Sequence, residues 1–236
     1  MREGSCNVTA EEGNGMRVLF EPVQNTTSGA TLGFRCVLGG NDDLSRISLK
    51  DAFPLQKPID AVATANNRLT QAAAETLRDL EAAGRHERVI VPVSARALAG
   101  VDAATKTLAP LKSLTSPQKQ HLIVEMFDLP QRLSLDALED ATIPLLSYAH
   151  GFIGHPPVGL HDCTVFANCN YLGLMVTLRG DEDDEFELRS TWAEGQKRRL
   201  KLVVGGIASP EILALAKKYE AFGISGPTVA PLRISI

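Results

Sequence analysis

Cysteine and aromatic residues are scarce in this chain of 236 residues. Four cysteines, one tryptophan and an aromatic share of 5% are spread along the sequence. Thiols so few and so scattered do not make a disulfide framework in a chain that is long enough to bury its own core. We therefore expect Cys6, Cys36, Cys163 and Cys169 to be reduced thiols.

Long apolar runs and an excess of basic residues are also missing. Residues 1–15 are polar and contain no apolar block of signal-peptide length, and the later apolar runs, such as residues 89–93, have the length of a strand. The 24 basic residues are outnumbered by 28 acidic ones, so no broad cationic face is available for a nucleic-acid backbone. These absences predict a cytoplasmic protein with no membrane span and no direct nucleic-acid partner.

The sequence does show a regular alternation of strand and helix patterns. Residues 1–15 lack periodicity and predict a disordered leader, so we expect the domain to span residues 16–236. A strand-turn-strand pattern at residues 17–38 opens that domain. Its alternation with helices predicts an α/β fold whose mostly parallel sheet closes into a TIM-like barrel with the helices outside. Further strands are predicted at residues 89–93, 121–126, 172–178, 200–207 and 221–224, and helices at residues 61–83, 134–149, 186–199 and 210–219.

Five stretches follow one another in the order of a known family. They are Phe20-Glu21-Pro22-Val23 with residues 33–38, then residues 91–98, 123–128 and 202–209, and finally residues 223–226 with 230–232. In their order and in their residues they resemble the motifs of the EAL domain family of cyclic-di-GMP phosphodiesterases. The resemblance implies a TIM-like (βα) barrel of the EAL type with one irregular or antiparallel strand.

The resemblance also implies a chemistry that this sequence has lost. The family hydrolyses a phosphodiester with two divalent ions, which oxygen ligands hold. Arg35 stands at the signature glutamate and Pro92 at an asparagine ligand, while Gly205 and Ser225 replace a glutamate and a glutamine. Of the matched ligand positions only Glu125 keeps its carboxylate, and one carboxylate cannot assemble a two-metal centre. We therefore expect no enzyme activity, no catalytic residue and no cofactor.

The residues with which the family binds cyclic-di-GMP are also replaced. Glu21 replaces the glutamine of the first strand, and Gly39 and Ala230 stand where the family has arginines that clamp phosphate. We therefore do not expect cyclic-di-GMP to bind. Arg35 and Arg96 could nevertheless bind phosphate in a way that the family does not use. A receptor that binds cyclic-di-GMP without hydrolysing it is therefore an alternative.

Imidazole and thiol side chains gather at residues 150–169, where the family keeps its catalytic loop. His155, His161 and Cys163 are the candidates for a new metal or thiol site, and His150 and Cys169 lie nearby. Their spacing matches no paired zinc pattern, and cysteine is common in cores as a small apolar residue. We favour a role of these side chains in structural packing. The alternative, a barrel with a new metal or thiol site, stays open.

An acidic run, Asp181-Glu182-Asp183-Asp184-Glu185, directly precedes the helix predicted at residues 186–199. Negative charge stabilises the amino end of a helix, and it also steers a basic partner. We predict a non-catalytic regulatory domain that binds a regulatory or motility protein, with Asp181, Asp183 and Asp184 as partner-binding residues. The sequence leaves the oligomeric state open, a homodimer included.

Overall fold

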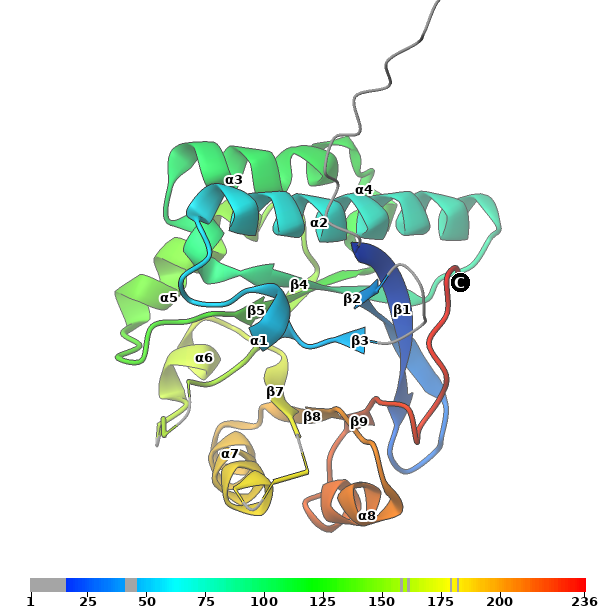
Figure 1. Ribbon diagram of the computed structural model, residues 1–236, viewed down its shortest axis with the longest axis vertical. Coiled ribbons are helices and arrows are strands. Elements are labelled where there is room, and N and C mark those ends of the chain that lie inside the picture. Colours follow the sequence, from blue (N-terminus) through cyan, green and yellow to red (C-terminus); the bar gives the residue numbers. More distant parts are fainter. Residues whose placement is uncertain (1–15, 41–45, 158, 161, 179, 182) are drawn as a thin grey trace, which may run out of the picture.

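The strands of this protein form one sheet that closes on itself. The computed structural model describes residues 16–40, 46–157, 159–160, 162–178, 180–181 and 183–236. The strand order is β1-β9-β8-β7-β6-β5-β4-β2-β3, and β1 also pairs with β2, so eight strands close a barrel and β3 lies at its edge (Figure 1). The predicted disordered leader at residues 1–15 lies outside the described residues.

One strand of the barrel runs against the others. β1 pairs antiparallel with both β2 and β9, whereas β2 and β4 to β9 pair in parallel. This pairing confirms the predicted barrel with one antiparallel strand. The strands are β1 (Met16–Asn25), β2 (Thr31–Gly40), β3 (Arg46–Ile47), β4 (Arg88–Ser94), β5 (Leu122–Phe127), β6 (Gly151–Gly154), β7 (Gly173–Thr177), β8 (Lys201–Gly205) and β9 (Gly223–Ile224).

The helices surround the barrel, with α2 and α3 on one side and α7 and α8 on the opposite side (Figure 1). Among the described residues, no helix combines the length and the apolar character needed to cross a bilayer. The α-helices are α1 (Leu49–Ala52), α2 (Ile59–Ala82), α3 (Val101–Leu108), α4 (Ser116–Lys119), α5 (Leu135–Thr142), α6 (Thr164–Asn168), α7 (Asp184–Arg198) and α8 (Pro210–Lys218). Short 3-10 turns are η1 (Ala95–Leu98), η2 (Ala109–Ser113) and η3 (Ile143–Leu145).

Several parts of the fold differ from the sequence prediction, which did not include α1, α3, α4, α6, β3 and β6. The helix expected at residues 134–149 ends at Thr142 and passes into η3, because Pro144 has no backbone N–H to continue it. The strand β6 was not predicted, since its four residues include two glycines and show no alternation. Gly154 is required there, because a Cβ atom at this position would collide with the ring of Phe166. The small residues thus let α6 pack closely against β6.

The inside of the barrel begins with an apolar layer. Each of six strands contributes one buried side chain to it, and Leu32 packs against the cluster. Alternation along the strands places the opposite faces against the helices, where the larger core lies. The layer consists of Val23, Ile90, Ile123, Ile153, Met175 and Val203.

Candidate functional site

A polar layer lies next to this apolar layer, toward the carboxyl ends of the parallel strands. Residues two positions away on the same strand point to the same face, so Glu125 follows Ile123 into the barrel and Glu21 lies beside Val23. TIM-like barrels place their chemistry at this end. We call the layer the inner polar ring; its members are Glu21, Arg35, Pro92, Glu125, His155, Thr177, Gly205 and Ser225.

Arg35 and Glu125 form a bidentate ion pair inside this ring. Arg35 Nε donates to Glu125 Oε2, and Arg35 Nη2 donates to Glu125 Oε1 over 2.5 Å. Both side chains are fully buried. Two parallel N–H···O bonds fix the relative position of a guanidinium and a carboxylate and are stronger than bonds between neutral groups.

Glu21 faces the other side of the Arg35 guanidinium. Arg35 Nη1 lies 3.5 Å from Glu21 Oε2, which makes an ion pair rather than a hydrogen bond. Arg46 Nη1, carried by β3, donates to Glu21 Oε1 over 3.1 Å, and Ser225 Oγ donates to Glu21 Oε2 over 2.8 Å. The two carboxylates of the ring therefore face two guanidinium groups.

His155 completes the contacts of Glu125. It directly follows β6, and its Nε2 lies 2.5 Å from Glu125 Oε1. The imidazole is 19% exposed, whereas the carboxylate is 0% exposed, so His155 lies between Glu125 and solvent. Protein side chains thus engage both oxygens of Glu125.

These contacts outweigh the effect of burial on the charged groups. Burial alone raises the pKa of Glu125, but the charges of Arg35 and His155 hold that pKa well below its ordinary value. Burial alone lowers the pKa of Arg35, and the carboxylates of Glu125 and Glu21 reverse this and raise it. Both groups stay ionised, so the ring is a charge-compensated cluster.

The positions that the resemblance assigned to metal ligands do lie together. Arg35, Pro92, Glu125, Gly205 and Ser225 all belong to the inner polar ring. Glu125 lies near the carboxyl end of β5 and points into the barrel, where ion pairs engage its buried carboxylate. Arg46 was not predicted as part of the site, since a strand of two residues has no recognisable pattern.

Arg96, the other candidate for a phosphate contact, binds the protein itself. Its Nη1 donates to the carbonyl oxygen of Pro54 over 3.2 Å and its Nη2 to that of Lys57 over 2.8 Å. Asp128 Oδ2 lies 3.9 Å from Arg96 Nη1 and accepts a hydrogen bond from Ser94 Oγ over 2.7 Å. Burial raises the pKa of Asp128, although Ser94 and Arg96 oppose the shift. Arg96 therefore holds the segment that leads into α2.

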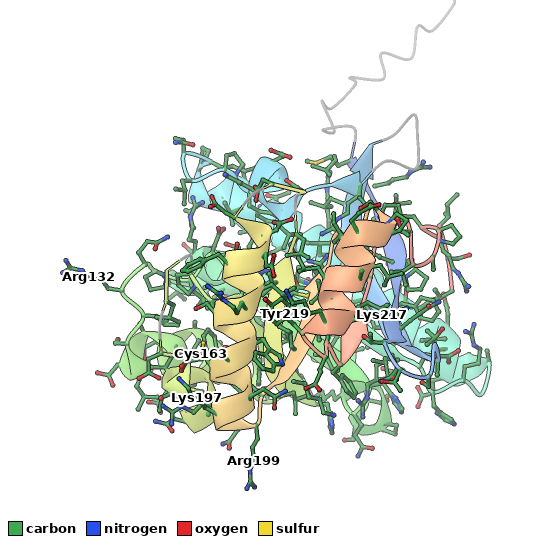
Figure 2. All side chains as sticks on the ribbon, turned by 90° about the horizontal axis from the view of Figure 1, so that it is seen from below. Arg132, Cys163, Lys197, Arg199, Lys217 and Tyr219 are labelled. Atoms are coloured by element: carbon green, nitrogen blue, oxygen red, sulfur yellow. The ribbon has the colours of Figure 1, made fainter. Side chains whose placement is uncertain are left out.

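The structure does not bring the imidazole and thiol candidates into one described site. His155 contacts Glu125, whereas Cys163 lies beside α7, with Glu194 as a charged neighbour (Figure 2). Burial and the charge of Glu194 raise the pKa of Cys163 to about 12, which keeps it a thiol rather than a thiolate. His161 lies outside the described residues.

Parts of the acidic run serve the fold. Asp184 is buried, and its Oδ2 accepts a hydrogen bond from the backbone N–H of Gly180 over 2.7 Å. Glu185 Oε1 accepts hydrogen bonds from Lys218 Nζ over 2.6 Å and from Tyr219 Oη over 3.1 Å, which tie α7 to α8. The expectation that Asp184 is an exposed partner-binding residue was therefore wrong. Asp181 and Asp183 are exposed, and Glu182 lies outside the described residues.

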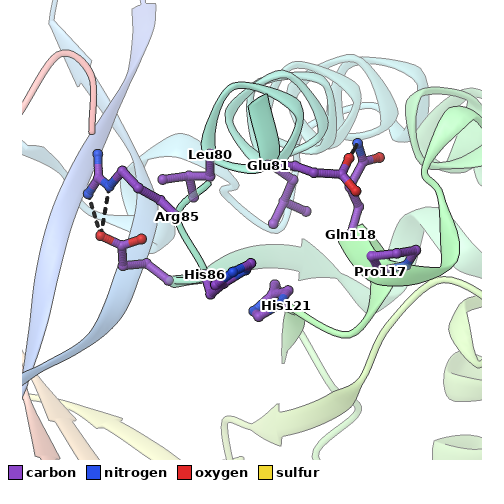
Figure 3. A pocket seen from close by; sticks show the side chains of 9 residues that line it. Leu80, Glu81, Arg85, His86, Pro117, Gln118 and His121 are labelled. Carbon is purple, nitrogen blue, oxygen red and sulfur yellow. Dashed lines mark hydrogen bonds and ion pairs between the residues drawn. The ribbon is translucent and has the colours of Figure 1, made fainter. Parts of the chain in front are cut away.

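A small hollow lies at the opposite end of the barrel, where β4 and β5 begin (Figure 3). Its volume is about 50 Å³. The rings of His86 and His121 stack beside it with their centroids 5.6 Å apart. Glu81 is engaged by Gln118 Nε2. A cavity of this size holds a few water molecules, so the hollow is far too small for a dinucleotide.

The fold resembles solved EAL domains over most of the chain. The PaMucR phosphodiesterase in its c-di-GMP complex gives a TM-score of 0.71 at 17% identity, with 93% of this chain and 97% of that chain covered. The FimX EAL domain gives a TM-score of 0.70 at 15% identity, with 95% of this chain and 93% of that chain covered. A third similar structure is YkuI of Bacillus subtilis, an EAL-domain protein in complex with substrate c-di-GMP and calcium. It gives a TM-score of 0.69 at 13% identity, with 94% of this chain and 56% of that chain covered. No sequence-family model and no characterised protein sequence matches the chain. The likeness shows the fold, and this chain is an EAL-type barrel.

Proposed function

We propose that this chain is a non-catalytic EAL-type signalling domain that acts in the cytoplasm by binding another protein. The observation that carries the proposal is the charge balance of the inner polar ring. Arg35 lies between Glu125 and Glu21, so a divalent ion approaching either carboxylate meets a fixed positive charge that cannot be titrated away. The similar YkuI structure holds calcium and c-di-GMP.

The remaining ring positions support the same conclusion. Metal-assisted hydrolysis needs several oxygen ligands around each ion. Pro92 and Gly205 supply no side-chain oxygen, although a Cβ atom at Gly205 would meet its neighbours only at ordinary distances of 3.4 Å and more. Within the part of the chain that the structure describes, no three His, Cys, Asp or Glu side chains converge as a metal site requires.

A hydrolysis assay tests the proposal directly. Purified protein is incubated with cyclic-di-GMP and Mg²⁺ or Mn²⁺, and the linear dinucleotide is quantified by chromatography. We expect no product above a buffer blank. Arg35→Glu alone should also stay inactive, because Pro92, Gly205 and Ser225 remain unchanged. Product formed by the wild-type chain contradicts the proposal.

A cyclic-di-GMP receptor without hydrolysis is the second candidate. It is favoured by the similar structures of PaMucR and of the Xanthomonas citri FimX EAL domain, which are complexes with c-di-GMP. Both guanidinium groups at the ring here already pair with Glu21 or Glu125, so they offer little to a phosphate. Equilibrium dialysis with labelled cyclic-di-GMP separates the candidates, since saturable binding without hydrolysis supports the receptor.

The proposed partner is a regulatory or motility protein. Affinity capture with mass spectrometry identifies it, and light scattering of the purified chain tests the alternative of a homodimer. Nucleic acid is not the proposed partner, because the net charge of -4 opposes a phosphate backbone.

A further inference from the structure

His155 differs from the other described histidines, because a carboxylate engages its ring. Its Nε2 lies 2.5 Å from Glu125 Oε1, and Glu125 is fully buried behind it. Among the described residues, no acid engages the other three rings: His86 and His121 stack on each other, and His150 lies exposed just before β6. The chemistry of His155 is therefore distinct.

The contact with Glu125 fixes which ring nitrogen of His155 carries the proton. An ionised carboxylate can only accept hydrogen bonds, so the Nε2 of the neutral imidazole donates and its Nδ1 holds the free lone pair. Burial alone raises the pKa of Glu125, but Arg35 and His155 hold that pKa well below its ordinary value, so Glu125 is ionised. Two hydrogen bonds from Arg35 also hold the carboxylate in place. The imidazole is thus kept in one tautomer and one orientation.

The second ring nitrogen of His155 is open to solvent. None of the described residues engages Nδ1, and this atom is not one of the buried nitrogens that lack a partner. The imidazole is 19% exposed and directly follows β6, at the carboxyl end of the barrel, where TIM-like barrels place their chemistry. An imidazole that is bound to a carboxylate through one nitrogen offers a nucleophile at the other.

The described charges around His155 balance one another. Arg35 opposes Glu125, and Arg96 Nη1 lies 3.9 Å from Asp128 Oδ2. Burial also raises the pKa of Asp128, although Ser94, Arg96 and His155 oppose the shift, so this acid takes up a proton more readily than an exposed one. From these residues, an anionic group that approaches Nδ1 meets no net negative charge.

We propose that His155 is a phosphoryl acceptor, a site of covalent modification at the carboxyl end of the barrel. Nδ1 attacks the phosphorus atom of a small donor that has a good leaving group, such as an acyl phosphate. The N–P bond forms as the P–O bond to the acyl group breaks, and the electron pair of that bond leaves with the carboxylate. The imidazole becomes cationic in this step, and Glu125 stabilises it through the Nε2–H.

The modification changes the charge of this end of the barrel. A phosphoryl group adds up to about two negative charges, and it adds them next to Asp128. The inference does not depend on the proposed interaction role, because it concerns a chemical property of the chain itself.

Phosphoramidate is the probe for this reaction, because it transfers its phosphoryl group to imidazole and releases ammonia. Purified protein is incubated with it, and mass spectrometry of its peptides, kept at alkaline pH, measures the label at each histidine. We expect His155 to be labelled about tenfold or more faster than His150, although the ring of His150 is the more exposed one. His155→Gln should remove this label and leave the label at His150 unchanged.

Glu125→Gln tests the stabilisation of the cationic ring. It should slow the labelling of His155 about tenfold, because the amide carries no charge that opposes the imidazolium. Circular dichroism shows whether the variant is folded. Asp128→Asn is the matched control, since it replaces the neighbouring acid that does not bind the ring, and it should not slow the labelling.

The comparison of His155 with His150 in the wild-type chain decides the question even where Glu125→Gln does not fold. Labelling of His155 that is no faster than that of His150 overturns the inference. An unchanged rate in folded Glu125→Gln, or equal slowing by Asp128→Asn, also overturns it.

Discussion

Arg35 and Glu125, 90 positions apart in the sequence, meet inside the barrel through two parallel hydrogen bonds. The pair lies where the EAL resemblance predicts metal ligands, and it places a permanent cation between two carboxylates. Burying an isolated ion costs several kcal/mol, so each member of the pair depends on the other. These ion pairs thus hold the ring together inside the barrel.

Arg35→Met should destabilise the protein strongly. The substitution leaves Glu125 buried with His155 as its remaining partner, and breaking a buried pair in this way costs about 3–5 kcal/mol of unfolding free energy. Urea denaturation followed by circular dichroism measures the loss.

The double variant Arg35→Met/Glu125→Gln serves as the test of coupling. It should recover much of the stability lost in the single variant, because the uncompensated charge is gone. Arg198→Met is a matched control, since its ion pair with Asp162 is exposed and should contribute at most about 1 kcal/mol. Strictly additive losses for Arg35 and Glu125 would contradict a coupled pair.

Acid should destabilise the protein through Glu125. Its folded-state pKa lies below the ordinary value of 4.5. Unfolding therefore takes up a proton once the pH falls to about 4.5 and below. The stabilisation is complete above that range and is lost progressively in acid, by at most about 1.4 kcal/mol per pH unit. Glu125→Gln should make the loss shallower in denaturation series at successive pH values.

Asp128 is the control of opposite sign. Burial raises its folded-state pKa, so its contribution is present below the ordinary value of 3.8 and is lost as the pH rises through the folded-state pKa. Asp128→Asn should therefore make the acid loss steeper than in the wild type. An unchanged pH profile for both variants would show that neither carboxyl governs acid stability.

Arg96→Ala should loosen the turn before α2. The substitution removes the hydrogen bonds to the carbonyl groups of Pro54 and Lys57 while the buried ring of Phe53 stays in place. Hydrogen exchange of the amides at residues 55–57 and 59 should accelerate, because exchange reports local opening. Arg132→Ala, an exposed residue on another loop, should leave these amides unchanged. Equal exchange in all three proteins would show that the turn does not depend on Arg96.

The barrel could be predicted because its signals are local. Strand and helix alternation gave the closed α/β fold, and short motifs gave the positions that meet in the inner polar ring. The partners of the side chains could not be predicted, since Arg46 reaches Glu21 only after β3 has paired with β2. Asp184 shows the same limit, because its burial depends on how the loop after β7 folds back onto α7.

The acidic run yields the last prediction, because its members now separate into two groups. Asp181 and Asp183 are exposed, whereas Asp184 is buried and accepts a hydrogen bond from the backbone N–H of Gly180. Asp181→Ser and Asp183→Ser should change the unfolding free energy by less than about 0.5 kcal/mol, as is usual for exposed substitutions. Asp184→Ala should cost about 1–2 kcal/mol, because it removes a part-buried hydrogen bond to a charged acceptor.

The same variants decide whether the exposed carboxylates steer a partner. If they do, the association rate of the Asp181→Ser/Asp183→Ser protein with a captured partner should fall at low salt, and added salt should slow the wild type toward the variant. Stopped-flow fluorescence measures both rates. Equal association rates for the wild type and the Asp181→Ser/Asp183→Ser variant would exclude these two residues from the encounter.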